Sequence, residues 1–236
     1  YSTTAMSAAE KFAPPSLRHL FGTDNFGRDI FSRVMQGLGT TVTISSLVVL
    51  FSGGIGILLG ALTGYFGGLL DEAVMRVTDA VNGFPSILLT LVIISILGSG
   101  RQNVILSLGI VFVPSYVRIV RGEFIRLRDA DYISRARLMG VGKLRILFVH
   151  ILPNIFSVFW VSVMIGFNNA ILAESGMSYL GIGVQAPDAS LGNMLSDAQG
   201  YLQRASWYAL APGLAIVWLV LGFSLFGEGV RRRGQT

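Results

Sequence analysis

The chain has 236 residues, of which 52% are hydrophobic and only 13% are charged, whereas soluble domains carry about 25% charged residues. It contains 29 glycines and no cysteine, which excludes a disulfide scaffold, a zinc–thiolate site, an iron–sulfur cluster and thiol catalysis. A net charge of +5 is also found in nucleic-acid-binding proteins, but on so apolar a chain the position of the basic residues decides its meaning. The composition predicts an all-α, polytopic membrane protein.

Uncharged stretches mark the expected membrane spans, because a charge is costly at the bilayer centre and a helix needs about 20 apolar residues to cross. The sequence contains five such stretches. We expect spans at about residues 40–66, 80–98, 102–118, 151–173 and 205–227. A transmembrane domain at 38–229 would then follow an external N-terminal segment, 1–37, and precede a cytoplasmic tail, 230–236.

The basic residues predict the orientation of these spans. With the C-terminus in the cytoplasm, twelve of the 18 Lys and Arg residues fall in segments on the inside, eight of them within residues 118–150. Cytoplasmic loops carry such an excess in membrane proteins. Residues 118–150 are therefore expected inside and residues 174–204 outside, and the basic character of the chain does not indicate nucleic-acid binding.

Residues 118–150 are too long for a simple connection and are expected to form a helix, a turn and a helix. Asp129 and Asp131 are candidate N-caps, since a carboxylate accepts the free N–H groups of a first turn. Gly140 and Gly142 are placed to end this short helix.

Ile133, Ala136 and Met139 follow one another at every third position and would form one apolar stripe on this helix. A short helix of this kind is suited to docking in a groove of a soluble partner. Its basic flanks are equally suited to anionic lipid headgroups. The residues alone leave both interpretations open.

Residues 132–140, followed by 150–154, resemble the coupling-loop signature of permease subunits of binding-protein-dependent ABC importers. Specifically, they are similar to the C-type permease of oligopeptide, dipeptide and nickel importers. The family pattern is Glu-Ala-Ala, three residues, Gly, and Leu-Pro downstream; Ser134 and Arg135 stand in place of the first two residues, while Ala136 and Gly140 keep the register. The resemblance implies docking into an ATPase subunit through Asp131, Tyr132, Ile133, Ser134, Arg135, Ala136, Met139 and Gly140.

Further stretches that resemble the same family are residues 19–33, 174–187, 191–194 and 211–215. Family members have six spans, the first of them before the segment that corresponds to residues 22–29, so the resemblance implies that the first span is missing here. Residues 174–204 correspond to the family's external loop. Within it we expect Glu174, Gln185 and Asn193 to form an external gate or to contact a binding protein.

Four glycines recur at every fourth position of the first expected span: Gly56, Gly60, Gly64 and Gly68. Small residues at this spacing let a second helix approach closely, so we expect a packing role, with a lining for a passing substrate as the alternative. The stretch at residues 140–144 invites a phosphate-loop interpretation, but Arg137 and Leu144 occupy positions that this motif reserves for Gly and Ser or Thr.

No catalytic constellation or metal site is recognisable, and His19 and His150 are expected on opposite sides of the membrane. The resemblance implies a transporter subunit that is not itself an enzyme and holds no cofactor, with ATP and Mg in partner subunits. The implied partners are a second, homologous permease, two ABC ATPases, an extracytoplasmic substrate-binding protein and the lipid bilayer of a bacterial or archaeal cytoplasmic (inner) membrane. The implied substrate is a peptide or a nickel chelate. An ATP-independent channel or secondary transporter is the alternative, although the uncharged spans show neither the intramembrane charges nor the repeat that it would need.

Overall fold

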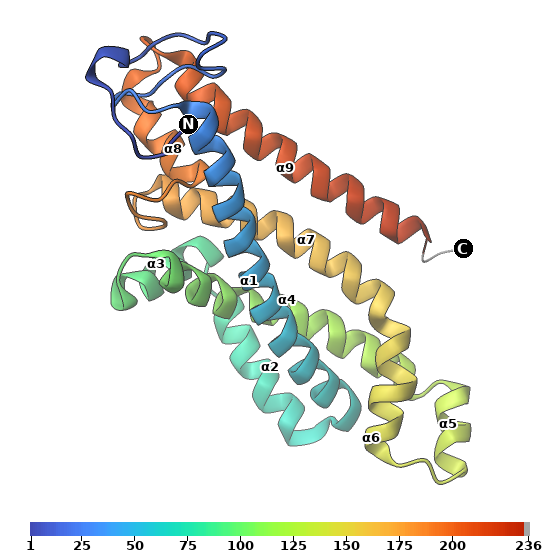
Figure 1. The fold of residues 1–236 in the computed structure, drawn as a ribbon. Coiled ribbons are helices and arrows are strands. Elements are labelled where there is room, and N and C mark those ends of the chain that lie inside the picture. Colours follow the sequence, from blue (N-terminus) through green and yellow to red (C-terminus); the bar gives the residue numbers. More distant parts are fainter. Residues whose placement is uncertain (234–236) are drawn as a thin grey trace. The chain divides into compact units, whose positions relative to one another are not determined.

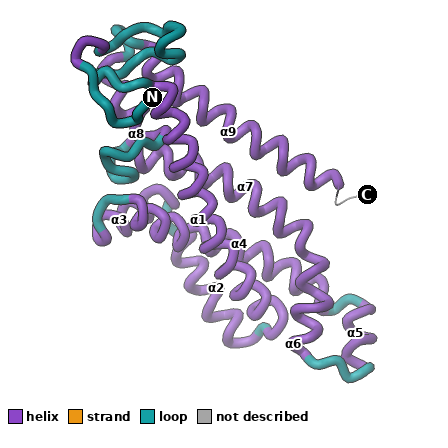
Figure 2. Tube along the Cα trace, viewed as in Figure 1, coloured by secondary structure: helices purple, strands orange, loops and turns teal. Residues whose placement is uncertain are grey.

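The structure is a computed structural model that describes residues 1–233; residues 234–236, the end of the expected tail 230–236, lie outside the described residues. The described residues form helices and loops without a strand (Figures 1 and 2). The α-helices are α1 (Ile30–Phe66), α2 (Gly68–Asn82), α3 (Ser86–Leu97), α4 (Arg101–Arg128), α5 (Asp131–Leu138), α6 (Lys143–Arg145), α7 (Leu152–Tyr179), α8 (Leu191–Ala198) and α9 (Ser206–Arg233). The short elements are the 3-10 turns η1 (Ala8–Glu10) and η3 (Gln199–Tyr201) and the π-helical stretch η2 (Ile146–Ile151).

Four of the described helical stretches are long and apolar enough to cross a membrane: Ile30–Phe66, Arg101–Arg128, Lys143–Tyr179 and Ser206–Gly229. A fifth span exists if α2 and α3 count together, although they are bent by 92° at their junction. With 12 residues, α3 alone rises only about 18 Å, short of a hydrocarbon core about 30 Å thick. The all-α membrane fold is confirmed. The expected second span at residues 80–98 contains the end of α2, the bend and the whole of α3, so its helix after Pro85 is present but too short to cross alone.

The first long helix begins well before the expected residue 40. Asp29 starts it, because its Oδ2 accepts from the Ser32 backbone N–H at 2.8 Å and from the Ser32 hydroxyl at 2.7 Å. Asp29 is itself held by His19, whose Nδ1 lies 2.9 Å from Oδ1. Burial acts to raise the pKa of Asp29, but the hydrogen bonds from His19 and Ser32 outweigh it and lower that pKa. The capped helix therefore extends into the segment 1–37 that was expected to precede the membrane domain.

The described chain divides into two compact units. The first comprises Tyr1–Leu47, Thr90–Leu108 and Phe167–Phe223. Its hydrophobic core is formed where the start of α1 meets α8 and the beginning of α9. The core residues are Ile30, Val34, Ala189, Leu191, Met194, Ala198, Ala205 and Tyr208.

The second unit comprises Val48–Leu89, Gly109–Gly166 and Ser224–Thr236. Here the second half of α1 packs along α4, and two ion pairs join α2 to α4. In the more buried pair, Arg121 Nη2 donates to Asp71 Oδ2 at 2.7 Å and Nε contacts Oδ1 at 2.5 Å, which is the two-pronged geometry that suits a guanidinium and a carboxylate. The second pair is more exposed and has a single contact, in which Arg118 Nη2 donates to Asp79 Oδ1 at 2.6 Å.

Candidate functional site

The segment between α4 and α7 contains the short helix that the sequence predicts. Asp131–Leu138 forms α5, but its N-cap is Ala130, whose backbone oxygen accepts from the N–H groups of Ile133 and Ser134 at 3.0 Å each. No side chain caps the helix, so the expectation that Asp129 or Asp131 does so was wrong. Asp131 instead lies in the first turn, where a negative charge interacts favourably with the helix dipole.

The helix ends in a Schellman motif at the expected glycine. The Gly140 N–H donates to the Arg137 carbonyl at 3.0 Å, and the Val141 N–H donates to the Ala136 carbonyl at 3.1 Å. Gly140 has a φ of +79°, a left-handed conformation that favours glycine. This turn separates α5 from α6 and fixes where the last apolar side chains of α5 lie.

The faces of α5 differ from the expected arrangement. Ile133 and Ala136 are buried within the chain itself, so they are not an outward docking stripe. Met139 lies past the last helical residue and is 77% exposed, next to Leu138 at 88%. Tyr132, Ser134 and Arg135 are also exposed. The most exposed apolar side chains of this segment therefore lie at the C-terminal end of α5.

The connection from α6 into α7 is a π-helical stretch, whose turns are wider than those of an α-helix. Pro153, near the start of α7, has no N–H for the carbonyl four residues before it, and its ring disfavours a regular α-helical turn there. The chain responds with the π-helical stretch η2, in which the Leu152 N–H donates to the Leu147 carbonyl. Such π-helical stretches are often found at functional sites. Here it lies inside the span-length stretch Lys143–Tyr179, near the end that follows α5.

The glycine row of α1 faces α4. A Cβ added at Gly56, Gly60 or Gly64 would lie 2.2, 2.7 or 2.6 Å from the Cβ of Tyr116, Val120 or Phe124, respectively. Only glycine permits this spacing of the two backbones. Gly68 is not part of the row, because α1 ends at Phe66 and a Cβ at Gly68 would meet no atom within 4 Å.

At the far end of α7, Glu174 is fully buried in a polar junction. The Thr41 hydroxyl of α1 donates to Oε2 at 2.8 Å, and the Ser178 hydroxyl donates to Oε1 at 2.7 Å. Ser178 Oγ also accepts from the Val184 N–H at 3.1 Å, which continues the junction into the following loop. Glu174 therefore links α1, α7 and that loop, and its carboxylate is not on the outer surface.

The other two residues expected at the external loop have different roles. Asn193 forms a capping box with Ser190 at the start of α8: its N–H donates to Ser190 Oγ at 3.3 Å, and its Oδ1 accepts from the Ser190 N–H at 2.9 Å. Gln185 is exposed and donates to the Gly181 carbonyl at 3.0 Å. Of Glu174, Gln185 and Asn193, only Gln185 presents an open side chain.

Sequence reasoning missed Thr41 and Ser178 as partners of Glu174 and the ion pair of Asp71 with Arg121. Ser178 follows Glu174 by four residues and so lies on the same helix face, a spacing that could have indicated the contact. Thr41 is 133 residues away from Glu174, and nothing local in the sequence connects them. The described residues contain no group of three or more His, Cys, Asp or Glu side chains that could hold a metal ion.

Span-length apolar helices, a close glycine-mediated helix contact and a buried carboxylate held by hydroxyls are the features of a polytopic α-helical membrane protein. The model of the family described as "Binding-protein-dependent transport system inner membrane component" matches residues 56–233. The chain belongs to this family and is a multi-pass membrane permease subunit.

Curated relatives match along most of the chain. The dipeptide transport system permease protein of Haemophilus influenzae is 41% identical over 213 residues, which are 90% of this chain and 72% of that protein. The corresponding protein of Alkalihalophilus pseudofirmus is 41% identical over 217 residues, 92% of this chain and 71% of that protein. A probable D,D-dipeptide transport system permease protein of Escherichia coli is 36% identical over 231 residues, 98% of this chain and 78% of that protein.

Solved structures show the same fold. A chain of the MetNI methionine ABC transporter in an inward-facing conformation superposes with a TM-score of 0.72 at 18% identity, covering 86% of this chain and 97% of that one. A chain of an amino acid ABC transporter determined with histidines gives a TM-score of 0.65 at 17% identity, covering 86% of this chain and 94% of that one.

Proposed function

We propose that this permease forms half of the translocation path of an ATP-driven importer for short peptides. The observation that carries the proposal is 41% identity, over 90% of the chain, to a dipeptide transport permease. A second, homologous permease would supply the other half of the path. An extracytoplasmic substrate-binding protein would deliver the peptide, and two ABC ATPases would bind ATP and Mg, for which this sequence offers no phosphate loop.

We propose further that α5 transmits the movement of an ATPase to the spans. Its buried residues Ile133 and Ala136 fix the helix to its own unit, whereas Leu138 and Met139 remain exposed at its end. Arg137 reinforces the attachment, because its Nη2 donates to the Arg128 carbonyl at 2.9 Å and its guanidinium lies 5.8 Å from the centre of the Tyr65 ring. A helix held this firmly transfers a push on its exposed end to α4 and α1.

The peptide substrate is tested with the assembled complex in proteoliposomes. Dipeptides, added with the binding protein, should stimulate ATP hydrolysis and accumulate inside only when ATP is supplied. A nickel chelate should do neither. Stimulation by the nickel chelate alone would reject the peptide, and uptake without ATP would favour a channel or secondary transporter.

The coupling role of α5 is tested with Leu138→Asp and Met139→Asp in the same complex. Each puts a charge on the surface that would be desolvated on docking, so ATPase binding and peptide-stimulated hydrolysis should fall together. The matched control is Leu17→Asp, which changes an exposed leucine in the N-terminal segment, outside both α5 and the external loop. Normal transport by both α5 variants, with the ATPase bound, would make α5 a membrane-surface element.

A further inference from the structure

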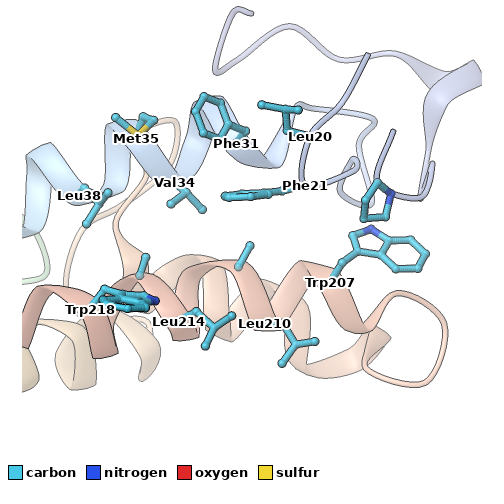
Figure 3. A pocket seen from close by; sticks show the side chains of 13 residues that line it. Leu20, Phe21, Phe31, Val34, Met35, Leu38, Trp207, Leu210, Leu214 and Trp218 are labelled. Carbon is cyan, nitrogen blue, oxygen red and sulfur yellow. The ribbon is translucent and has the colours of Figure 1, made fainter. Parts of the chain in front are cut away.

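Helix α1 meets its neighbours in different ways at its two ends. Near its start, Phe31, Met35 and Leu38 line one wall of an apolar groove whose opposite wall comes from α9 (Figure 3). Contacts between apolar side chains have no preferred direction. The last turn of α1, by contrast, is held by two arginine side chains, one from α4 and one from α5. A displacement of α5 therefore has directed contacts through which it can act on this end of α1.

Arg128, the last residue of α4, holds the end of α1 with its side chain. Its Nη1 donates to the Gly64 carbonyl at 3.2 Å. Gly64 lies in the last turn of α1, where backbone carbonyls lack partners within the helix and the helix dipole favours a positive charge. Only 33% of the Arg128 side chain is exposed. The guanidinium of Arg128 therefore caps α1 from the end of α4.

Arg137 of α5 makes the corresponding contact with the end of α4. Its Nη2 donates to the backbone carbonyl of Arg128 at 2.9 Å. Its guanidinium also lies 5.8 Å from the centre of the ring of Tyr65, a buried residue next to Gly64. The backbone of Arg128 thus accepts a hydrogen bond from α5 while its side chain donates one to α1. Arg128 therefore joins three helices.

A second arginine in the last turn of α4 shows that position alone does not create this link. Arg126 pairs with Glu123 of its own helix, and 64% of its side chain is exposed. Arg128 also contacts a neighbour in sequence, since its Nε lies 3.4 Å from Asp129 Oδ2, but that contact uses a different nitrogen from the one that reaches Gly64. Arg126 is therefore a matched reference for the role of Arg128.

We propose that Arg128 is the positioning residue that couples α1 to α5. The inference rests on the proposed role of α5 as the element that an ATPase moves. When α5 moves, Arg137 carries the end of α4 with it, and Arg128 carries the end of α1. The close glycine contact keeps α1 and α4 together along their length. The two helices then respond to α5 as one body, through a continuous chain of hydrogen bonds and rigid elements.

The contact itself is tested by measuring how firmly α5 is held to α1. Leu58→Cys on α1 and Ser134→Cys on α5 place two spin labels at exposed positions of the cysteine-free chain. In the assembled complex without ATP, pulsed electron paramagnetic resonance should give one narrow distribution of the distance between them. Arg128→Met removes the donor and should broaden this distribution, whereas Arg128→Lys keeps a donor and a charge and should narrow it again. An unchanged distribution for Arg128→Met would overturn the proposal.

The coupling role is tested with the same complex in proteoliposomes. Arg128→Met should retain the bound ATPase, because the exposed end of α5 is unaltered. Peptide transported per ATP hydrolysed should fall by about fivefold, the factor that one hydrogen bond of ordinary strength contributes to an equilibrium. Arg128→Lys should recover part of this ratio, and Arg126→Met should leave it unchanged. An unchanged ratio for Arg128→Met, even with a broadened distance, would make the contact structural only and reject the coupling role.

A double variant shows whether Arg128 acts in one chain with Arg137. Once Arg137→Met has detached α5 from α4, loss of the Arg128 contact should have no further effect, because residues of one network are not additive. The double variant should therefore transport as much peptide per ATP as Arg137→Met alone. Losses that multiply would show that the two arginines act independently and would contradict the proposed chain.

Failure of the proposed docking of α5 has a different signature. Leu138→Asp changes the exposed end of α5 and should release the ATPase, whereas the arginine variants should keep it bound. If Leu138→Asp transports normally, α5 is not the docking element, and Arg128 then has no coupling role even where the spin labels confirm its contact. If Leu138→Asp releases the ATPase and Arg128→Met keeps the normal ratio, docking stands and only the role of Arg128 is rejected.

Discussion

Glu174 illustrates how an acidic side chain is accommodated within a helix of span length. Acidic residues inside membrane spans are costly unless polar groups surround them, and two hydroxyls donate to this carboxylate. The close approach of α8 adds to the enclosure, since a Cβ at Gly192 would lie 2.1 Å from the Ser175 carbonyl oxygen. The junction therefore ties the loop after α7 to α1 through one side chain.

Glu174→Ala should destabilise the protein, because the Thr41 and Ser178 hydroxyls would then lose a buried acceptor. Leaving buried polar groups unsatisfied costs about 1–3 kcal/mol. Glu174→Gln keeps an acceptor oxygen and should cost less. Thermal unfolding of the purified protein in detergent gives the comparison. Equal unfolding temperatures for the alanine variant and the unmodified protein would show that the junction contributes no stability.

Gly60 should not tolerate a side chain, because α4 lies too close to it. Gly54, on the same helix, has open space beside it and provides the control. A Cβ at Gly60 would lie 2.7 Å from Val120 Cβ and 2.8 Å from the Val117 carbonyl oxygen, neither of which is the end of a flexible side chain. Overpacking of this kind costs about 1–3 kcal/mol, so Gly60→Ala should lower the unfolding temperature. Gly54→Ala in the same helix meets nothing within 4 Å and should be neutral or stabilising. A tolerated Gly60→Ala would contradict the close contact of α1 with α4.

At the scale of the element, the position and the end of α5 could be predicted from the sequence, but its orientation could not. Gly140 ends the helix as its residue type indicates. The apolar spacing of Ile133, Ala136 and Met139 shows that a stripe exists and not what it contacts. Two of these residues turn out to pack inside their own unit. A stripe that docks on a partner and a stripe that attaches the helix to its own chain look the same in the sequence.

Gly140 should be required for its backbone conformation alone, since a Cβ there would meet nothing within 4 Å. Gly140→Val should disrupt the turn, because a β-branched residue tolerates a φ of +79° poorly. Gly140→Asn should retain much of it, since asparagine enters this region more readily. Limited proteolysis of the α5–α6 connection should show faster cleavage for Val than for Asn, together with weaker ATPase coupling. Equal cleavage would show that the turn does not depend on this residue.

Helix bounds were predicted less well than helix existence. Uncharged stretches locate the apolar part of a helix, whereas a cap or a proline decides where the helix begins or ends. Asp29 starts α1 ten residues before the expected span, and the charged Arg33 lies buried within it, 3.8 Å from Asp24. In the expected second span, the break before α3 falls at Pro85, which lies between α2 and α3. Charge spacing alone reveals neither feature.

For the whole molecule, composition and charge gaps were sufficient to predict an all-α membrane protein, because the bilayer constrains every crossing segment in the same way. The polar contacts within it were not predictable to the same extent. The repeat of Gly56, Gly60 and Gly64 is visible in the sequence because glycine at fixed spacing has few other uses. The pairs Glu174–Thr41 and Asp71–Arg121 join positions far apart in the chain, so only the fold brings them together.

The orientation of the chain follows from the distribution of its basic residues and is testable with single cysteines, since the sequence contains none. Gln185→Cys and Met139→Cys are suitable positions because both side chains are exposed. Twelve of the 18 basic residues lie on the side of residues 118–150, which predicts that side to be cytoplasmic. In intact spheroplasts an impermeant maleimide should therefore label residue 185, and it should label residue 139 only after permeabilisation.

A third variant separates orientation from burial. Ser190 lies in the same external loop but is fully buried and caps α8, so Ser190→Cys should label poorly until the protein is denatured. Weak labelling at this position would reflect packing, whereas weak labelling at the exposed residue 185 would reflect the wrong side of the membrane. Labelling of residue 139 in intact spheroplasts, with residue 185 protected, would invert the topology. Because an ATPase acts from the cytoplasm, that result would also remove α5 as its docking element.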